Sequence, residues 1–441
     1  MYLHRSIDNE LIKWKNSSSK KPLMIRGARQ VGKSSTIRNL GRQFSHYIEI
    51  NFDEQAFFSK VFEENTVFEI CEQIEALTGT PIVAGETLLF LDEIQTSLAA
   101  IGSLRYFYEK MPELHVIAAG SLLEFALSEL PSFGVGRIRS LYMYPFSFEE
   151  FLLVHQEKKL LTILQKANEN NPLPPIIHKK LSTYFRKFLI VGGMPEAVNT
   201  YVQTQSLLEV QTVLDDLINS FQADFTKYKT KIDTGSILQV FRAIVQQVGQ
   251  KFSYSYPEST LKNDKIKEIL ELLRMAGLVY FVTHSASNGI PLGAEINPKM
   301  KKIILFDTGI FQRLLGLDMK NLLLEDEVEV INKGNIAELH VGLELIKNSF
   351  LYQNPELFYW QRDAKNSQAE VDFVIQKGEK IIPIEVKSGK KGSMQSLFLF
   401  LGEKKTPYGI RISMENFSSI EKVKIIPLFG IQNLFLPNFI S

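Results

Sequence analysis

The chain lacks most of the residue patterns that stabilise secreted, zinc-binding or membrane proteins. Its 441 residues contain a single cysteine, Cys71, which excludes an internal disulfide and a zinc site built from cysteines. The seven histidines show no metal-ligand spacing, and no run approaches the roughly 18 apolar residues of a membrane helix. The first residues show no apolar signal region. We therefore expect a cytoplasmic protein with no membrane partner, in which Cys71 is a small core residue on a helix.

An excess of charge of one sign is also missing, because 50 Lys and Arg residues are balanced by 49 Asp and Glu residues, for a net charge of +1. Such a chain has no overall field that attracts nucleic acid, so any binding of this kind depends on a local patch. The hydrophobic content of 45% and the charged content of 22% are those of an ordinary globular chain. The length suggests two to four domains.

A glycine-containing segment at residues 27–34 matches the phosphate-binding loop pattern G-x-x-x-x-G-K-[ST]. It lies between an apolar stretch, suited to a buried strand, and a helix-forming segment. This arrangement makes a nest of backbone N–H groups for phosphate oxygens. We expect ATP here, with Lys33 reaching the β- and γ-phosphates and the Ser34 hydroxyl ligating Mg²⁺. The expected nucleotide-binding residues are Gly27, Ala28, Arg29, Gln30, Val31, Gly32, Lys33, Ser34 and Ser35.

A second motif, Asp92-Glu93, follows the continuous apolar run at 88–91, which fits a central parallel strand. Ligands of open α/β sheets bind at the carboxyl ends of such strands. Asp92 would hold the Mg²⁺ water shell, and Glu93 would orient and deprotonate the attacking water. Taken alone the pair would rather be a solvated helix cap; the preceding phosphate loop favours the catalytic interpretation.

Two further residues are candidates for the region of the γ-phosphate. Ser121 follows an expected strand at 115–119, where it fits either a polar sensor of the γ-phosphate or an ordinary Gly-Ser turn. Arg137 lies on a glycine-containing segment. It fits either an arginine that stabilises the γ-phosphoryl charge, in this chain or in a neighbouring copy, or a plain surface arginine. Both alternatives stay open for each residue.

The first 150 or so residues alternate strand and helix signals, with strands expected at 23–26, 47–51, 88–91 and 116–119. This predicts a doubly wound parallel sheet. Helices dominate from 148 to about 229. Residues 233–300 then read as three helices and a hairpin of strands at 278–283 and 291–296, a winged helix-turn-helix pattern. Its lysines could contact DNA or RNA, although such modules also dock proteins or are purely structural: Lys262, Lys265 and Lys267.

Near the C-terminus, two expected strands at 370–375 and 381–387 are joined by a short turn. Because side chains alternate along a strand, Glu385 and Lys387 share a face, and a hairpin can bring Asp372 beside them. This D…E-x-K arrangement is that of metal-dependent restriction-type nucleases. The carboxylates would bind Mg²⁺, and Lys387 would position water. Glu338, on an upstream helix, is a further candidate ligand. The alternative is a nuclease-like scaffold used for recognition only.

Several segments together resemble the prokaryotic AAA-type ATPases with a C-terminal domain of unknown function. They are 25–33, 90–95, 119–121, 136–137, 144–151, 192–198, 276–279 and 307–310. The resemblance covers nearly the whole chain. It implies a P-loop AAA-type ATPase domain at 1–150, a helical lid or linker at 151–232, a winged-helix-like region at 233–325 and a restriction-nuclease-like α/β domain at 326–441.

These observations predict an ATPase whose catalytic residues are Glu93, Lys33, Arg137 and Ser121 and whose cofactors are ATP and Mg²⁺. Hydrolysis would drive a conformational change in the C-terminal half, coupled to action on nucleic acid. The alternative function is an ATP-dependent switch or scaffold for a protein partner, with an inactive nuclease-like fold. The chain could also form a homo-oligomer.

Overall fold

The structure is a computed structural model that describes residues 2–18, 20–129, 136–228, 232–255, 261–319, 333–363, 369–389 and 394–436. The chain divides into two compact units. The first comprises residues 1–144 with two short later pieces, 275–277 and 350–354, and the second comprises the remainder. Among the described residues, no helix combines the length and the apolar composition needed to cross a membrane.

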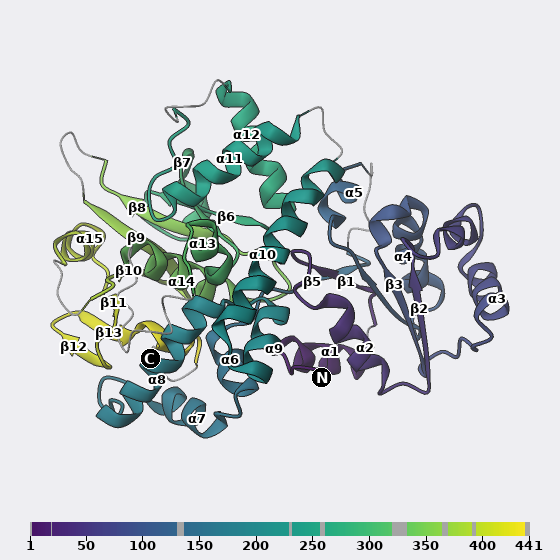
Figure 1. Cartoon of the computed structure of the whole chain (residues 1–441), viewed down its shortest axis with the longest axis horizontal. Coiled ribbons are helices and arrows are strands. Elements are labelled where there is room, and N and C mark those ends of the chain that lie inside the picture. Colours follow the sequence, from purple (N-terminus) through teal and green to yellow (C-terminus); the bar gives the residue numbers. More distant parts are fainter. Residues whose placement is uncertain are drawn as a thin grey trace. The chain divides into compact units, whose positions relative to one another are not determined.

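The first unit contains a five-stranded sheet of order β2-β3-β4-β1-β5, in which every neighbouring pair is parallel (Figure 1). Its strands are β1 (Leu23–Arg26), β2 (His46–Asn51), β3 (Thr87–Asp92), β4 (His115–Ala119) and β5 (Arg139–Tyr142). The predicted parallel sheet is therefore confirmed, and β3 is buried along its whole length. The sequence did not predict β5, because its residues Arg-Ser-Leu-Tyr form no apolar run.

Helices cover both faces of this sheet. They are α1 (Ile7–Lys15), α2 (Lys33–Gly41), α3 (Val67–Thr78), α4 (Leu98–Lys110) and α5 (Leu123–Glu129), with short 3-10 turns η1 (Ala56–Phe62) and η2 (Ile94–Thr96). Helix α3 begins at a capping box between Thr66 and Glu69 and ends at Gly79 in the left-handed conformation. Cys71 lies in the hydrophobic core beneath α3, as expected, and burial raises the pKa of its thiol to about 12.

The expected helical region opens the second unit. It comprises α6 (Phe148–Val154), α7 (Lys158–Lys166), α8 (Pro175–Val191), α9 (Pro195–Thr204), α10 (Leu207–Asp224) and the 3-10 turn η3 (Phe225–Lys227). Proline stands at the first position of both α8 and α9, where its missing N–H leaves no helical bond unmade.

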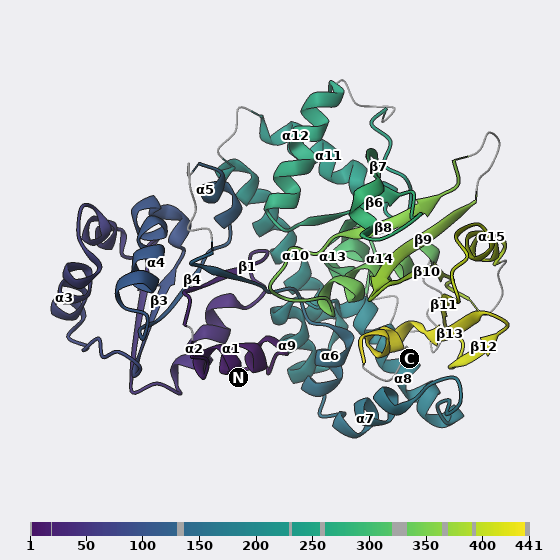
Figure 2. The same ribbon diagram turned by 180° about the vertical axis from the view of Figure 1, so that it is seen from behind.

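The second unit contains an eight-stranded mixed sheet of order β12-β13-β11-β10-β9-β8-β6-β7. Its strands are β6 (Val279–Ser285), β7 (Ile296–Leu305), β8 (Leu357–Gln361), β9 (Glu370–Lys377), β10 (Lys380–Val386), β11 (Gly409–Ser413), β12 (Ser418–Ile420) and β13 (Val423–Pro427). The expected hairpin is present, since β9 and β10 pair antiparallel. Figure 2 shows the sheet from behind, with α11 (Thr234–Gln247) and α12 (Asn263–Met275) beside its β6–β7 end.

The expected winged module differs from the structure in two respects. The described part of 233–300 contains two α-helices, α11 and α12, rather than three, and the second strand begins at Ile296, where we expected it to end. The stretch before it forms a 3-10 turn, η4 (Leu292–Glu295). The first half of β7 is exposed and gives no hydrophobic alternation, which explains the misplaced strand. Moreover, β6 pairs in parallel with β8, so the two expected wing strands belong to the C-terminal sheet.

Helices α14 (Lys333–Lys347) and α15 (Gln395–Lys404) pack on opposite faces of this sheet. Gly342 of α14 lies against Phe373 of β9, close enough that a Cβ on Gly342 would come within 3.1 Å of the ring. Phe400 of α15 shares a core cluster with Val374, the next residue of β9. Two further short helical elements complete the unit, α13 (Thr308–Leu314) and the 3-10 helix η6 (Leu428–Phe435).

Two of the segments that carry the family resemblance pack against each other. The Asp307 carboxylate accepts hydrogen bonds from the backbone N–H of Gly193 at 2.6 Å and of Ile310 at 3.0 Å. Gly192 has a φ of 75°, and a Cβ there would lie 2.3 Å from Asp307. The glycine pair and the Asp-Thr-Gly segment therefore form one buried junction that joins the end of α8 to the start of α13.

Candidate functional site

The backbone of the phosphate-binding loop takes the conformations that its glycines permit. Gly32 has a φ of 96° and immediately precedes α2, so the N-terminus of that helix opens at the loop. Gly27 has a φ of 142°, and a Cβ there would lie 2.1 Å from the Met143 carbonyl oxygen. Gln30, which is not a glycine, also has a positive φ of 61°. The loop thus runs from the end of β1 to the start of α2, as a phosphate-binding nest requires.

The side chain of Lys33 turns back over this loop. Its Nζ donates hydrogen bonds to the carbonyl oxygens of Gly27 at 2.9 Å and Ala28 at 2.8 Å. Burial lowers the pKa of Lys33 to about 8, against the opposing effect of the nearby carboxylates of Glu93 and Asp92. A buried ammonium that donates to loop carbonyls is suited to transfer its hydrogen bonds to phosphate oxygens.

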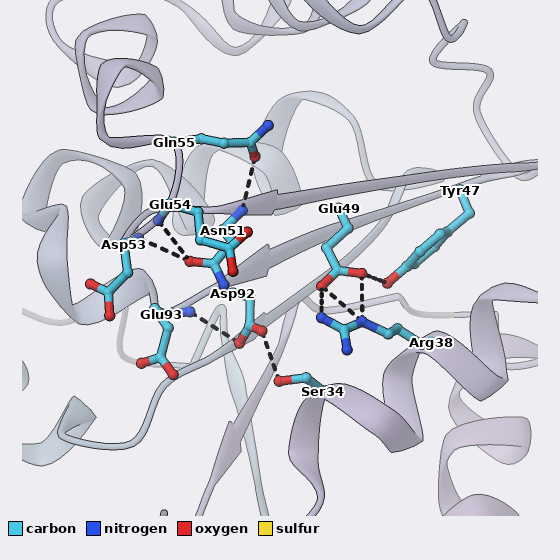
Figure 3. A network of polar contacts seen from close by, with 10 residues as sticks. All are labelled: Ser34, Arg38, Tyr47, Glu49, Asn51, Asp53, Glu54, Gln55, Asp92 and Glu93. Carbon is cyan, nitrogen blue, oxygen red and sulfur yellow. Dashed lines mark hydrogen bonds and ion pairs between the residues drawn. The ribbon is translucent and has the colours of Figure 1, made fainter. Parts of the chain in front are cut away.

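A hydrogen bond joins the loop to the end of β3. The Ser34 hydroxyl donates to Oδ2 of Asp92 at 2.7 Å, while Oδ1 accepts from the backbone N–H of Glu93 at 3.0 Å (Figure 3). Burial raises the pKa of Asp92, and the bond from Ser34 partly offsets that rise. A hydroxyl and a carboxylate side by side at a helix N-terminus are oxygen donors of the kind that Mg²⁺ prefers. These two residues fit the predicted metal.

Glu93 lies next to this pair and takes a left-handed backbone conformation with a φ of 50°. Its carboxylate is held by Gln95, whose Nε2 donates to Oε2 of Glu93 at 2.6 Å. The Ser121 hydroxyl approaches the same oxygen at 3.5 Å. The structure therefore brings two of the predicted catalytic residues together and adds Gln95, which we did not predict. The signal was available, because Gln95 follows Glu93 by two residues in a tight turn.

Gly120 makes room for this arrangement. A Cβ at Gly120 would lie 2.0 Å from Oε1 of Gln95, an oxygen that is buried and has no hydrogen-bond partner among the described residues. An unpaired buried carbonyl oxygen costs free energy, and this orientation of the amide allows its nitrogen to donate to Glu93. Its amide nitrogen faces the carboxylate.

Arg137 lies apart from these contacts. Its guanidinium pairs with Glu109 of α4, and half of the side chain is exposed. A different arginine lies next to the loop: Arg26, the last residue of β1, donates to the carboxylate of Glu124 at 3.0 Å. Within one copy of the chain, this position does not decide whether Arg137 stabilises the γ-phosphoryl charge or is a plain surface arginine.

The network in Figure 3 extends from the site along β2. Arg38 of α2 donates to both oxygens of Glu49, and the Tyr47 hydroxyl donates to the same carboxylate at 2.7 Å. At the end of the strand, Asn51 accepts hydrogen bonds from the backbone N–H groups of the following turn. These contacts fix α2 and the end of β2 beside β3 and thereby support the position of Asp92.

The second unit brings the predicted nuclease-like residues into one region, but in an arrangement that we did not expect. Lys302 of β7 lies among their carboxylates, with its Nζ 2.8 Å from Oε1 of Glu338 and 3.6 Å from Oδ1 of Asp372. A third carboxylate, Glu370, is 2.5 Å from the same nitrogen. Neither Lys302 nor Glu370 was a candidate, since no local pattern connects a lysine of one strand to carboxylates that follow much later in the chain.

Glu385 and Lys387 form a separate pair at 2.6 Å. Asp372 is beside them, because its Oδ2 accepts from the backbone N–H of Val386 at 2.8 Å. Burial, followed by the charge of Asp372, raises the pKa of Glu385 to about 7. The hairpin thus converges an Asp, a Glu and a Lys as alternation predicted.

The expected metal at Glu338, Asp372 and Glu385 does not fit this arrangement. Among the described residues, no group of three His, Cys, Asp or Glu side chains is placed to hold a metal ion. Two of the expected ligands instead share the ammonium of Lys302, and the third pairs with Lys387.

Two of the lysines expected to contact nucleic acid have acidic neighbours. Lys265 pairs with Asp233 at 3.0 Å, and Lys267 pairs with Asp264 at 2.8 Å. These exposed pairs lie on α12 and at the start of α11, and they reduce the positive charge of this surface.

Comparison with known families gives three successive matches along the chain. Residues 19–152 match an AAA domain, residues 182–321 a domain of unknown function (DUF8612), and residues 333–430 a second domain of unknown function (DUF4143). The first unit is thus an AAA-type P-loop fold. Its match and its motifs support nucleotide binding. A search of curated proteins finds no match.

Several solved structures are similar to this chain at low identity. One is the Walker-type ATPase PABY2304 of Pyrococcus abyssi, at 15% identity, 71% coverage of this chain, 96% of that chain and a TM-score of 0.45. Another is the Aeropyrum pernix ORC1 protein in complex with DNA, at 13% identity, coverage of 74% and 95%, and a TM-score of 0.26. Cdc6p from Pyrobaculum aerophilum matches at 11% identity, with coverage of 71% and 96% and a TM-score of 0.23.

Proposed function

We propose that this protein binds and hydrolyses ATP with Mg²⁺ at the phosphate-binding loop. The observation that carries the proposal is the hydrogen bond of 2.7 Å between Ser34 and Asp92, because it joins the loop and the end of β3 in one site. Lys33 binds the β- and γ-phosphates, and Glu93 accepts a proton from the attacking water. Mg²⁺ bound between Ser34 and Asp92 would neutralise charge on the phosphates.

The test is the rate of ATP hydrolysis by the purified full-length chain, measured with Mg²⁺ and with EDTA, and with and without DNA or RNA. We expect hydrolysis that requires Mg²⁺ and that Lys33→Ala abolishes. An unchanged rate in Lys33→Ala would assign the activity to a contaminant or to another site.

For the second unit, the leading proposal is action on nucleic acid controlled by ATP. The hairpin of β9 and β10, which carries Asp372, Glu385 and Lys387, supports it. A phosphodiester-cleavage assay on DNA and RNA with Mg²⁺ or Mn²⁺ tests it, with Asp372→Asn as the matched control. Cleavage that persists in Asp372→Asn would not come from this hairpin.

The second proposal is an ATP-dependent switch that binds a protein partner, with no cleavage. The position of Lys302 among the carboxylates favours it, because an internal ammonium takes up the negative charge that a catalytic metal needs. ATPase activity that responds to neither DNA nor RNA, together with no cleavage, would support this function over the first. Homo-oligomer formation is compatible with both proposals.

A further inference from the structure

Lys302 is one of the most deeply buried charged groups of the second unit. Its side chain is 1% exposed, and it projects from β7 toward α14 and β9. Three carboxylates surround the ammonium, at 2.5 Å from Glu370, 2.8 Å from Glu338 and 3.6 Å from Asp372. A lysine is buried to this degree only where its charge is compensated.

The charges of this group show that the ammonium persists. Burial alone opposes the charged form of Lys302, and the carboxylates of Glu338, Glu370 and Asp372, 2.5–3.6 Å from its Nζ, offset that cost. The ammonium donates a hydrogen bond to Glu338 and lies 2.5 Å from an oxygen of Glu370, while Asp372, at 3.6 Å, contributes charge without a hydrogen bond.

The same three oxygens are the donors that a hard divalent cation would use. Mg²⁺ requires oxygens at about 2.0–2.1 Å in octahedral geometry, whereas the three oxygens here are spaced around a larger ion. A divalent cation could not share the position with an ammonium of the same sign.

We propose that Lys302 is the built-in cation of this carboxylate cluster and stands where a divalent metal ion would otherwise bind. Glu338, Glu370 and Asp372 then compensate a lysine rather than ligate a metal, and the second unit is folded and complete without one. The inference concerns a different site from that of ATP hydrolysis and is independent of it. It is incompatible with metal-dependent cleavage at Asp372 and therefore favours the second proposed function of this unit, the ATP-dependent switch.

The experiment is a gain of metal binding. In Lys302→Met the side chain keeps its unbranched shape up to the Cε position and loses the ammonium, so three carboxylates remain without a cation. We expect the full-length, nucleotide-free variant to melt below the wild type, to bind Mn²⁺ by calorimetry, and to gain melting temperature as Mn²⁺ is added. In the wild type, Mn²⁺ should neither bind to the carboxylate cluster nor raise the melting temperature through it. The control Lys301→Met removes the neighbouring lysine, which packs over the Phe281 ring, and should behave as the wild type.

A second substitution assigns the bound metal to the cluster. Asp372→Asn, added to Lys302→Met, should remove the Mn²⁺ binding, while any ion at Ser34 and Asp92 is unaffected. The proposal is overturned if the wild type binds Mn²⁺ in a manner that Asp372→Asn abolishes. It is also overturned if Lys302→Met is as stable as the wild type and binds no metal. If Lys302→Met does not fold even with Mn²⁺, the wild-type and Asp372→Asn titrations still decide the question.

Discussion

The amide of Gln95 holds the carboxylate of Glu93, with a distance of 2.6 Å from Nε2 to Oε2. A carboxylate can only accept, so the amide nitrogen must be the atom that faces it. The bond fixes one oxygen of Glu93 and leaves the other to meet a water molecule. Gln95 is therefore a positioning residue for the proposed general base.

The first prediction concerns this pair. Gln95→Ala should lower kcat for ATP hydrolysis roughly 10- to 100-fold, the effect of losing a hydrogen bond to a charged group, with little change in KM. In a Glu93→Gln background the same substitution should have no further effect, because it acts through the lost carboxylate. A loss of equal size in both backgrounds would mean that Gln95 only stabilises the fold.

The second prediction is that Glu93→Gln binds ATP as the wild type does but hydrolyses it more slowly, by roughly 10²-fold or more. The variant keeps the shape of the side chain and loses the base. Steady-state hydrolysis and a nucleotide titration measure the two effects separately. Glu72→Gln, an exposed substitution on α3, is the control. Turnover within a factor of two of the wild type would move the catalytic role elsewhere, for example to Glu124.

The third prediction is that Lys33→Ala loses nucleotide binding, because the variant lacks the buried ammonium that now rests on the Gly27 and Ala28 carbonyls. Calorimetry or a fluorescent nucleotide analogue gives the affinity. The exposed Lys60→Ala should bind as the wild type does. Wild-type nucleotide affinity in Lys33→Ala would contradict the assignment of residues 27–34 as a phosphate-binding loop.

The fourth prediction tests Arg137, which is half exposed and pairs with Glu109. If it acts on a neighbouring copy, ATPase activity per molecule should rise with protein concentration over the range in which a sizing column shows assembly. Arg137→Ala should abolish that rise, whereas the exposed Arg42→Ala should keep it. Activity per molecule that stays constant across assembly would exclude action between copies.

The fifth prediction is a pH dependence of stability. Burial, with the nearby charges of Glu150 and Glu344, raises the pKa of Glu149 to about 7 from the ordinary 4.5. The folded state therefore holds this proton more tightly than the unfolded state, and the free energy of unfolding falls as the pH rises from about 4.5 to about 7.

Glu149→Gln should remove that fall. At pH 8 it should be more stable than the wild type by roughly 1–3 kcal/mol, and at pH 4 the two should be equal. Denaturant unfolding at both pH values provides the measurement, with the exposed Glu379→Gln as the control. A variant less stable than the wild type at pH 8 would contradict the assignment.

The sequence predicted those parts of the fold whose signals are local. The phosphate loop and the run before Asp92 carry their own patterns, and the parallel sheet follows from them. The β9–β10 hairpin was also predictable, because alternation within a short segment places Asp372 near Glu385 and Lys387. Local patterns of this kind predict only those residues of a site that lie close together in the sequence.

The remaining features depend on contacts between distant segments. Nothing near Lys302 indicates that it faces Glu338 and Glu370, so we expected a metal where the structure has an ammonium. The wing strand was misplaced because the first half of β7 is exposed and gives no hydrophobic alternation, although its partner β6 is the strand that we expected. The hydrogen bond from Gln95 depends on the absence of a side chain at Gly120, on a different strand end.

The pairing of β6 with β8 has a practical consequence for the choice of fragments to express. The boundary between the two domains of unknown function, at 321 and 333, falls between strands that share one ladder. A fragment that begins near 330 would present the bare edge of β8 to solvent, and such an edge recruits other chains. Expressed alone, that fragment should precipitate; expressed together with residues 145–320, it should be recovered as a soluble, non-covalent pair. The two domains, although they match separate family models, would then be stable only when both are present.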